Sequence, residues 1–187
     1  GTVGSLGALG SSELDAQVTA AYDASVVSGS PVEVAGYQLH DISQAQVTAI
    51  KLIDQLGPMD RIALIGEVGY TFVHDLAQGD DIIRYDTSVE NITEGSWGYR
   101  TRIVSKINNV FAGVNMTPTI SWSEDVKGNA AGPGGPFLEG NQSLGLSVKA
   151  NYMERYSAAV SYTQYEGGEY SVTGDRDFAS VSVDVQF

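Results

Sequence analysis

Hydrophobic and polar residues alternate along most of the chain, most clearly over its last ten residues, 178–187. Between Ala179 and Phe187 the odd positions are apolar and the even positions are polar. A period of two is typical of a β-strand with one apolar and one polar face. A terminal Phe suits the headgroup level of a membrane, so the pattern predicts a strand of a transmembrane barrel. The apolar row of this terminal strand is Ala179, Val181, Val183, Val185 and Phe187.

The same alternation recurs between turn-forming residues. About eight strands are predicted, at residues 13–23, 42–53, 61–74, 97–108, 112–122, 144–152, 156–162 and 178–187. The segment 42–53 is apolar on both faces, which is compatible with a β-bulge. A helix over 44–56 is the alternative, because Ala, Gln, Lys and Leu favour helix. Pro118 predicts a local irregularity in the strand that contains it.

The predicted connections alternate between short and long. Short turns are expected at 56–60, 109–111 and 153–155, and long loops at 24–41, 75–96, 124–140 and 166–177. Outer-membrane barrels have short periplasmic turns and long extracellular loops, and a periplasmic C-terminus places every short turn on that side.

Aromatic residues gather at the ends of the apolar rows. Such a girdle is typical of membrane barrels, whereas the apolar faces of a sandwich or jelly roll need not end in aromatics. We therefore predict an all-β fold, an antiparallel transmembrane β-barrel over 13–187, after a flexible segment at 1–12. The expected girdle is Trp97, Tyr99, Trp122, Tyr152, Tyr156 and Phe187.

Composition narrows the function classes. The chain has 187 residues, which fits one domain. Its net charge of -13 disfavours nucleic acid as a partner. It has no cysteine, which excludes disulfide scaffolds and thiolate metal sites and suits an oxidising envelope compartment. No apolar run is long enough for a transmembrane helix, and a barrel needs none.

Several stretches resemble a family of long Gram-negative outer-membrane proteins, catalogued as domain of unknown function thirteen-oh-two. The resemblance covers roughly 42–187 and is weaker over the first forty residues. The terminal strand also resembles the one that outer-membrane barrels present to their assembly machinery. The matching stretches are 64–70 (LIGEVGY), 96–100 (SWGYR), 109–118 (NVFAGVNMTP), 122–128 (WSEDVKG), 134–140 (GGPFLEG), 156–158 (YSA) and 175–178 (DRDF).

The resemblance implies that this chain is the C-terminal part of a larger barrel. It implies an outer-membrane lipoprotein and an exporter of the resistance-nodulation-division type as partners, besides outer-membrane lipids and lipopolysaccharide. The implied role is transport or trafficking of lipid or other hydrophobic cargo. The family has no established catalytic residues, so the resemblance carries none over.

A charged cluster is predicted on the non-lipid face of two neighbouring strands. Arg100, Arg102 and Lys106 share one face, and Glu67 lies on the same face of the preceding strand. Cross-strand neighbours reach each other. These residues either attract anionic cargo along a lumen or form a salt-bridge network in a polar interior; we favour the network because charges there need partners.

Two further features suggest chemistry, and both have a simpler interpretation. The acidic loop suits divalent cations that bridge to lipopolysaccharide, but its spacing fits no calcium loop, so a solvated loop is favoured. His40-Asp41 and His74-Asp75 fall at strand ends and leave a hydrolase as a third hypothesis. The acidic residues are Asp80, Asp81, Asp86, Glu90 and Glu94.

The sequence thus predicts an outer-membrane barrel component that handles hydrophobic cargo. The alternative is a complete eight-stranded barrel with adhesive or interaction loops. We expect no enzyme activity, cofactor or metal site.

Overall fold

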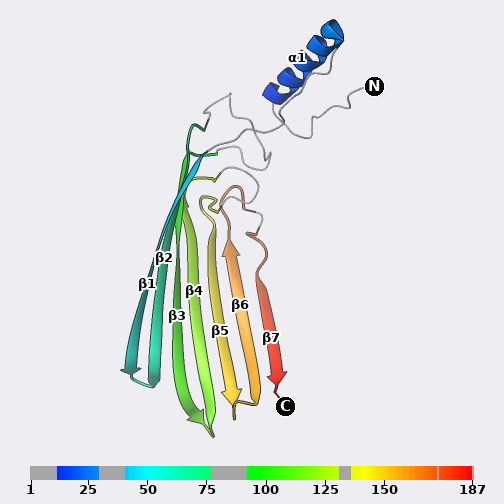
Figure 1. Ribbon diagram of the computed structural model, residues 1–187. Coiled ribbons are helices and arrows are strands. Elements are labelled where there is room, and N and C mark those ends of the chain that lie inside the picture. The colour runs from blue at the N-terminus through cyan, green and yellow to red at the C-terminus, as the bar shows by residue number, and fades with distance from the viewer. Residues whose placement is uncertain (1–11, 30–40, 77–91, 131–135, 172, 187) are drawn as a thin grey trace.

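The computed structural model describes residues 12–29, 41–76, 92–130, 136–171 and 173–186 (Figure 1). Within them, the strands form one antiparallel sheet in the order β1 to β7, so each strand pairs with its neighbours in sequence. The sheet is open, with β1 and β7 as its edges, and the predicted antiparallel all-β architecture is confirmed to this extent. The elements are α1 (Ser12–Ser28), β1 (Ile42–Leu56), β2 (Met59–Val73), β3 (Gly95–Phe111), β4 (Val114–Lys127), β5 (Gln142–Tyr152), β6 (Tyr156–Glu166) and β7 (Phe178–Val185).

The strand predicted at 13–23 is wrong, because this segment belongs to helix α1. Its alternating apolar positions include Ala16 and Ala20, and alanine favours helix over strand. The described residues therefore contain seven strands rather than about eight. Figure 1 shows α1 apart from the sheet, beyond the ends of the strands. No helix in the described part of the chain is long and apolar enough to cross a bilayer.

The segment that could have been a helix is strand β1. Its register with β2 runs without a shift from Ile42 opposite Val73 to Asp54 opposite Arg61, so the bulge is not formed. Ile50 and Leu52 simply lie on the face opposite to Val47. The tight turn after Leu56 returns the chain alongside itself, and pairing with β2 outweighs the local preference for helix.

Short and long connections between the strands lie at opposite ends of the sheet, as predicted (Figure 1). The long loop predicted at 24–41 is wrong over residues 24–28, which belong to α1. The β1–β2, β3–β4 and β5–β6 turns share one end with the C-terminus. The middle turn is displaced from its predicted place at 109–111, because β3 continues through Phe111. Instead Ala112 and Gly113 turn the chain, with φ of 47° and 84°. The Gly113 N–H donates to Asn109 Oδ1 at 3.0 Å, which closes this turn.

Register decides which side chains share a face, because directly paired residues point the same way. On one face of the sheet the apolar residues of neighbouring strands lie side by side, and this face is called the apolar face. The other, the polar face, carries amides, hydroxyls and charges, with an apolar patch of Ile50, Leu52, Ile65 and Val104. The apolar face includes Val47, Leu64, Val68, Ile103, Ile120, Leu146, Val148, Val160, Val181, Val183 and Val185.

Most of the apolar face is not buried against other parts of the described chain. Val47 is 72% exposed, and Val181 and Val183 are each 73% exposed. In the described ranges the buried apolar side chains are limited to Ile62, Val73 and Ala130. A soluble sheet would pack this face against a second layer. No such layer lies within the described residues.

Candidate functional site

The predicted charged cluster lies together on the polar face. Glu67 is the direct partner of Arg100, and Arg61 is the partner of Lys106. Arg102 lies between the two cations of β3, opposite Ile65. The side chains of the three β3 cations are exposed, and Glu67 is half-buried. The prediction that these four residues share one face of the sheet is therefore confirmed.

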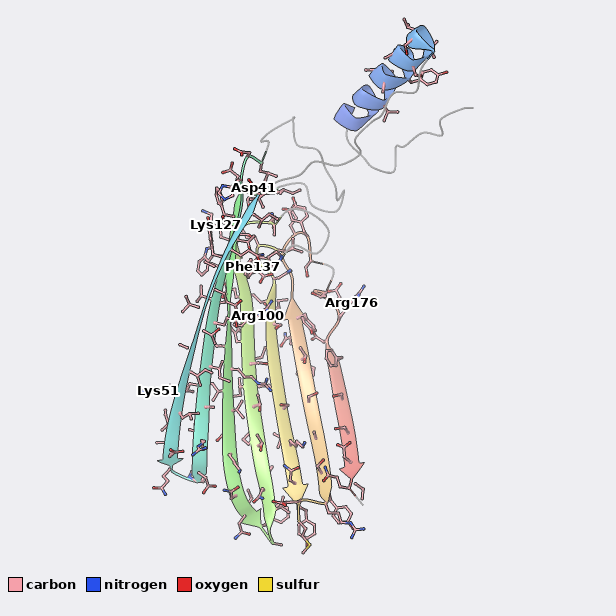
Figure 2. The ribbon with its side chains drawn as sticks, viewed as in Figure 1. Asp41, Lys51, Arg100, Lys127, Phe137 and Arg176 are labelled. Carbon is pink, nitrogen blue, oxygen red and sulfur yellow. The ribbon has the colours of Figure 1, made fainter. Side chains whose placement is uncertain are left out.

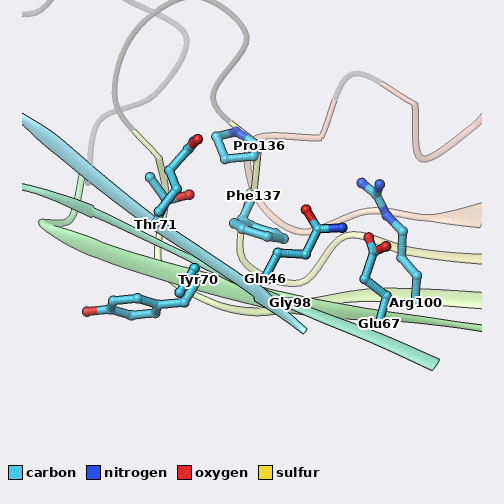
Figure 3. Close-up of a pocket in the computed structure, with 11 residues that line it drawn as sticks. Gln46, Glu67, Tyr70, Thr71, Gly98, Arg100, Pro136 and Phe137 are labelled. Atoms are coloured by element: carbon cyan, nitrogen blue, oxygen red, sulfur yellow. The ribbon is translucent and has the colours of Figure 1, made fainter. Parts of the chain in front are cut away.

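The favoured salt-bridge network along β3 is not formed within the described part of the chain. The ion pair found there joins Arg61 Nε to Asp54 Oδ1 at 2.7 Å. Glu67 Oε2 instead accepts a hydrogen bond from Thr48 Oγ1 at 3.2 Å. Figure 3 shows Glu67 and Arg100 next to each other at one side of a cleft.

Hydroxyl groups flank the β3 cations on the next strand. Ser123 pairs with Arg100, and Ser121 pairs with Arg102. Ser123 Oγ also lies 2.8 Å from Ser143 Oγ on β5. The polar face thus offers cationic groups beside neutral hydrogen-bonding groups, an arrangement able to bind the acidic or polar end of an amphipathic molecule.

A cleft of about 370 Å³ lies on the polar face near the end that carries the long loops. Tyr70 contributes to its wall, but its ring points away from the cleft (Figure 3). Drug-sized ligands occupy clefts of about 300–1,000 Å³. The side chains that define the cleft are Gln44, Gln46, Glu67, Thr71, Arg100 and Phe137.

Phe137 covers two glycines that face each other on adjacent strands. Gly69 and Gly98 are direct register partners. A Cβ at Gly69 would lie 2.9 Å from Phe137 Cζ. A Cβ at Gly98 would lie 2.9 Å from Phe137 Cδ1 and 2.6 Å from the Glu124 carbonyl oxygen. Larger residues at these positions would displace the ring, so the glycines form its seat.

Hydrogen bonds hold the segments on either side of this ring. Asp125 accepts from the Leu138 N–H at its Oδ2, at 3.0 Å, and from the Gly140 N–H at its carbonyl, at 2.9 Å. Glu139 Oε2 accepts from the Gly128 N–H at 2.8 Å. The Ala130 N–H donates to the Phe137 carbonyl at 2.9 Å. The Phe137 loop, defined here by residues 128–130 and 136–141, is therefore tied to the end of β4.

The same loop buries polar residues at the ends of β2 and β3. Thr71 is 6% exposed and Ser96 is 2% exposed. Asn129 is also buried and accepts from the Thr93 N–H at its carbonyl, at 2.9 Å. Its own N–H donates to Thr93 Oγ1 at 2.9 Å. This packed region gives the loop a fixed position over the polar face.

Sequence reasoning missed Phe137, which lay in a predicted Gly/Pro loop without an assigned role. Two signals were available: Gly69 and Gly98 interrupt predicted strands, and strand glycines often mark a close approach. The pairing of these two glycines became visible only once the register was known.

Aromatic side chains lie near both ends of the apolar face. Tyr99 Oη donates to Glu124 Oε2 at 2.7 Å and accepts from Trp122 Nε1 at 3.1 Å. At the other end the rings of Tyr152 and Tyr156 stack 6.4 Å apart. The predicted row-end positions of Trp97, Tyr99, Trp122, Tyr152 and Tyr156 are confirmed. Phe187 lies outside the described residues.

The other predicted site residues are only partly described. His40, Asp80, Asp81, Asp86 and Glu90 lie outside the described ranges. The His74 Nε2 lies 2.8 Å from Ser43 Oγ, and the ring packs edge-on against Phe72 at 4.9 Å. His74 is thus placed at the aromatic end of the apolar face, and the hydrolase hypothesis stays a prediction.

Comparison with known proteins gives one finding. Neither a curated protein nor a solved structure matches the chain significantly. A family model described as "Protein of unknown function (DUF1302)" matches residues 4–187. The match extends the resemblance seen over 42–187 to nearly the whole length. The chain therefore belongs to the DUF1302 family.

Proposed function

We propose that this chain forms part of an outer-membrane β-barrel whose polar face lines a passage for lipid or other hydrophobic cargo. The observation that carries the proposal is the exposed apolar face, bounded by aromatic side chains near both ends of the strands. Burying a Val or Leu side chain is worth about 1.5–3 kcal/mol. An apolar surface spread over seven strands needs a hydrophobic surrounding, and hydrocarbon supplies it.

The spacing of the aromatic ends agrees with a bilayer. Gln142 pairs with Glu124, the acceptor of Tyr99, and Tyr152 lies at the other end of β5. At about 3.3 Å per residue, Gln142 to Tyr152 measures about 33 Å along the strand. A strand tilted by about 40° covers about 25 Å of bilayer over this length, the usual height of the apolar band.

The polar face suits amphipathic cargo. The exposed cations of β3 can bind an acidic group, and the apolar patch on the same face offers a surface for an alkyl portion. Lipopolysaccharide and phospholipids are the proposed surroundings of the barrel. The assembly machinery is the proposed partner of the terminal strand. An outer-membrane lipoprotein and an exporter of the resistance-nodulation-division type are the proposed partners in transport.

Membrane insertion is tested by two lysines on adjacent residues of β7. Val181 lies on the apolar face in register with Val160, and Ser182 lies on the polar face in register with Ala159. Lysine on the lipid face near the midplane costs about 2–4 kcal/mol. We expect Val181→Lys to deplete the protein from the outer-membrane fraction and Ser182→Lys to leave it there. Equal tolerance of both variants would contradict the assigned facing.

Transport is tested in proteoliposomes that contain the purified protein and an entrapped amphipathic anionic dye. We expect dye release to require the protein. Arg100→Gln combined with Arg102→Gln should slow the release of the anionic dye and leave that of a neutral amphipathic dye unchanged. Efficient insertion without release of either dye would remove the transport role and keep the membrane assignment.

A further inference from the structure

We propose that Phe137 determines the size of cargo admitted to the passage, as the tip of a fixed constriction formed by the Phe137 loop. This inference rests on the proposed function, because it needs the polar face to line the passage.

The location follows from register. Gly69 and Gly98 are on the polar face, since their neighbours two residues away along the strands are Glu67 and Arg100. The ring that covers these glycines therefore stands on the same side as the cationic groups. Figure 2 places Phe137 beyond Arg100, toward the end of the sheet that carries the long loops. A molecule moving along the polar face toward that end meets the ring.

The position of the ring is fixed rather than adjustable. The Phe137 carbonyl accepts from Ala130, the next residue Leu138 donates to Asp125, and Glu139 donates to Asn129 Oδ1 at 3.0 Å. Backbone and side-chain bonds thus hold residues 137–139 to the end of β4 and to residues 129 and 130. A loop held in this way keeps one position over the polar face, because moving it would leave several polar groups unpaired.

The glycine seat sets how far the ring stands above the sheet. At Gly69 the three atoms nearest to an added Cβ all belong to the Phe137 ring, and the shortest contact is 2.9 Å. A methyl group there would therefore meet the ring first and raise it. Gly69→Ala is therefore a test of the contact between the glycine and the ring. A substitution at Gly98 is less specific, because an added Cβ there would also meet the Glu124 carbonyl oxygen.

The room left beside the ring defines the class of cargo. The cleft between Phe137, Gln46 and Arg100 holds about 370 Å³. That volume is close to the lower end of the range for small-molecule sites, about 300–1,000 Å³. The cleft accommodates a slender amphipathic molecule, with an apolar part against the ring and a polar or acidic end near Arg100, and it is too small for bulky cargo.

The test uses a single cysteine, because the chain contains none. Gln46→Cys places a thiol in the cleft, on the polar face opposite Gly69. The full natural protein is reconstituted in liposomes in a cysteine-free background and labelled with maleimides of increasing size. We expect slow labelling by large maleimides, a severalfold increase with Phe137→Ala, and an intermediate rate with Phe137→Leu.

Two controls are matched to these variants. Residue 182 lies on the polar face of β7, at the far edge of the sheet. Maleimide labelling of the Ser182→Cys protein should therefore not change with Phe137→Ala. Phe178→Ala removes an aromatic residue from the polar face of β7, away from the cleft, and should not change labelling at residue 46. Equal labelling of the Gln46→Cys protein with and without Phe137 would overturn the constriction.

Coupling between seat and ring gives a second, independent measurement. Gly69→Ala should change the labelling rate of the Gln46→Cys protein when Phe137 is present and have no effect in the Phe137→Ala background. An equal effect of Gly69→Ala in both backgrounds would show that the substitution acts by changing strand β2 itself. That result would contradict the role of Gly69 as a seat for the Phe137 ring.

Dye release separates this inference from the proposed function. If Phe137→Ala admits larger dyes than the wild type, both proposals stand. If wild type and variant release the same range of dyes, the constriction is wrong and the passage stands. If neither releases any dye, the passage is contradicted and the size-selection role falls with it, while the labelling still shows whether the ring covers the cleft.

Discussion

Pro118 has no backbone N–H to donate, and the pairing of β3 with β4 is interrupted at this residue, opposite Ser105. Pro118 pairs with Val148 on β5, but no paired residue on β3 matches it, although the β3–β4 register is the same on both sides. The predicted irregularity is therefore a gap in pairing rather than a shift. Ser105 lies opposite this gap, 6% exposed, and its Oγ has no hydrogen-bond partner in the described part of the chain.

We predict that Ser105→Ala leaves stability unchanged or raises it by about 1 kcal/mol, because a buried hydroxyl without a partner has lost hydration and gained nothing. Ser123→Ala is the matched control. Its Oγ lies 2.8 Å from Ser143 Oγ, so its removal should cost about 0.5–1.5 kcal/mol. Urea unfolding of the reconstituted protein measures both. A larger loss for Ser105→Ala than for Ser123→Ala would show that Ser105 makes a bond in the membrane.

The β5–β6 hairpin illustrates a turn whose conformation and sequence disagree. Met153 and Glu154 have φ of 51° and 54°. Two successive positive φ values are typical of a type I′ turn, which strongly favours Asn-Gly. Neither Met nor Glu prefers this region, so the flanking strands impose it. Tyr152 and Tyr156, stacked across the hairpin, and the Arg155 guanidinium, 5.6 Å from the Tyr156 ring centre, support the closed turn.

Replacing Met153-Glu154 by Asn-Gly should therefore stabilise the protein by about 1 kcal/mol, since the turn then adopts its preferred backbone. The expected observation is a higher urea midpoint with an unchanged slope. Pro-Gly at the same positions is the control, because proline cannot reach positive φ and should destabilise the hairpin. A lower midpoint for the Asn-Gly variant would mean that Met153 or Glu154 has contacts worth more than the relieved backbone.

Features that depend on spacing within one strand were predictable, and features that depend on pairing were not. The period of two identified β2 to β7 and the faces of Arg100 and Val181 before any pairing was known. The same criterion misassigned α1, because alternation of Leu and Ala over one segment does not distinguish strand from helix. The position of Phe137 could not be predicted, because the ring packs on two glycines of different strands and their pairing is not visible in the sequence.

The parity of the sheet bears on whether its strands can close into a barrel. With seven strands in antiparallel succession, β1 and β7 run in the same direction, as the arrows in Figure 1 show. An up-and-down barrel in which all neighbours are antiparallel has an even number of strands. The seven described strands would therefore close into such a barrel only with an odd number of additional strands. This supports the proposal of a larger barrel over a barrel made from these strands alone.

The two tryptophans report directly on what surrounds the apolar face. Trp97 and Trp122 are the only tryptophans in the chain, and both lie on that face near the end with the long loops. In liposomes we expect lipids brominated near the headgroup to quench their fluorescence more than lipids brominated near the chain end, because aromatic belts sit at the interface. Trp97→Phe and Trp122→Phe separate the two signals. Quenching by aqueous iodide alone would place this face in water and would contradict the proposed hydrocarbon environment, on which the proposed passage depends.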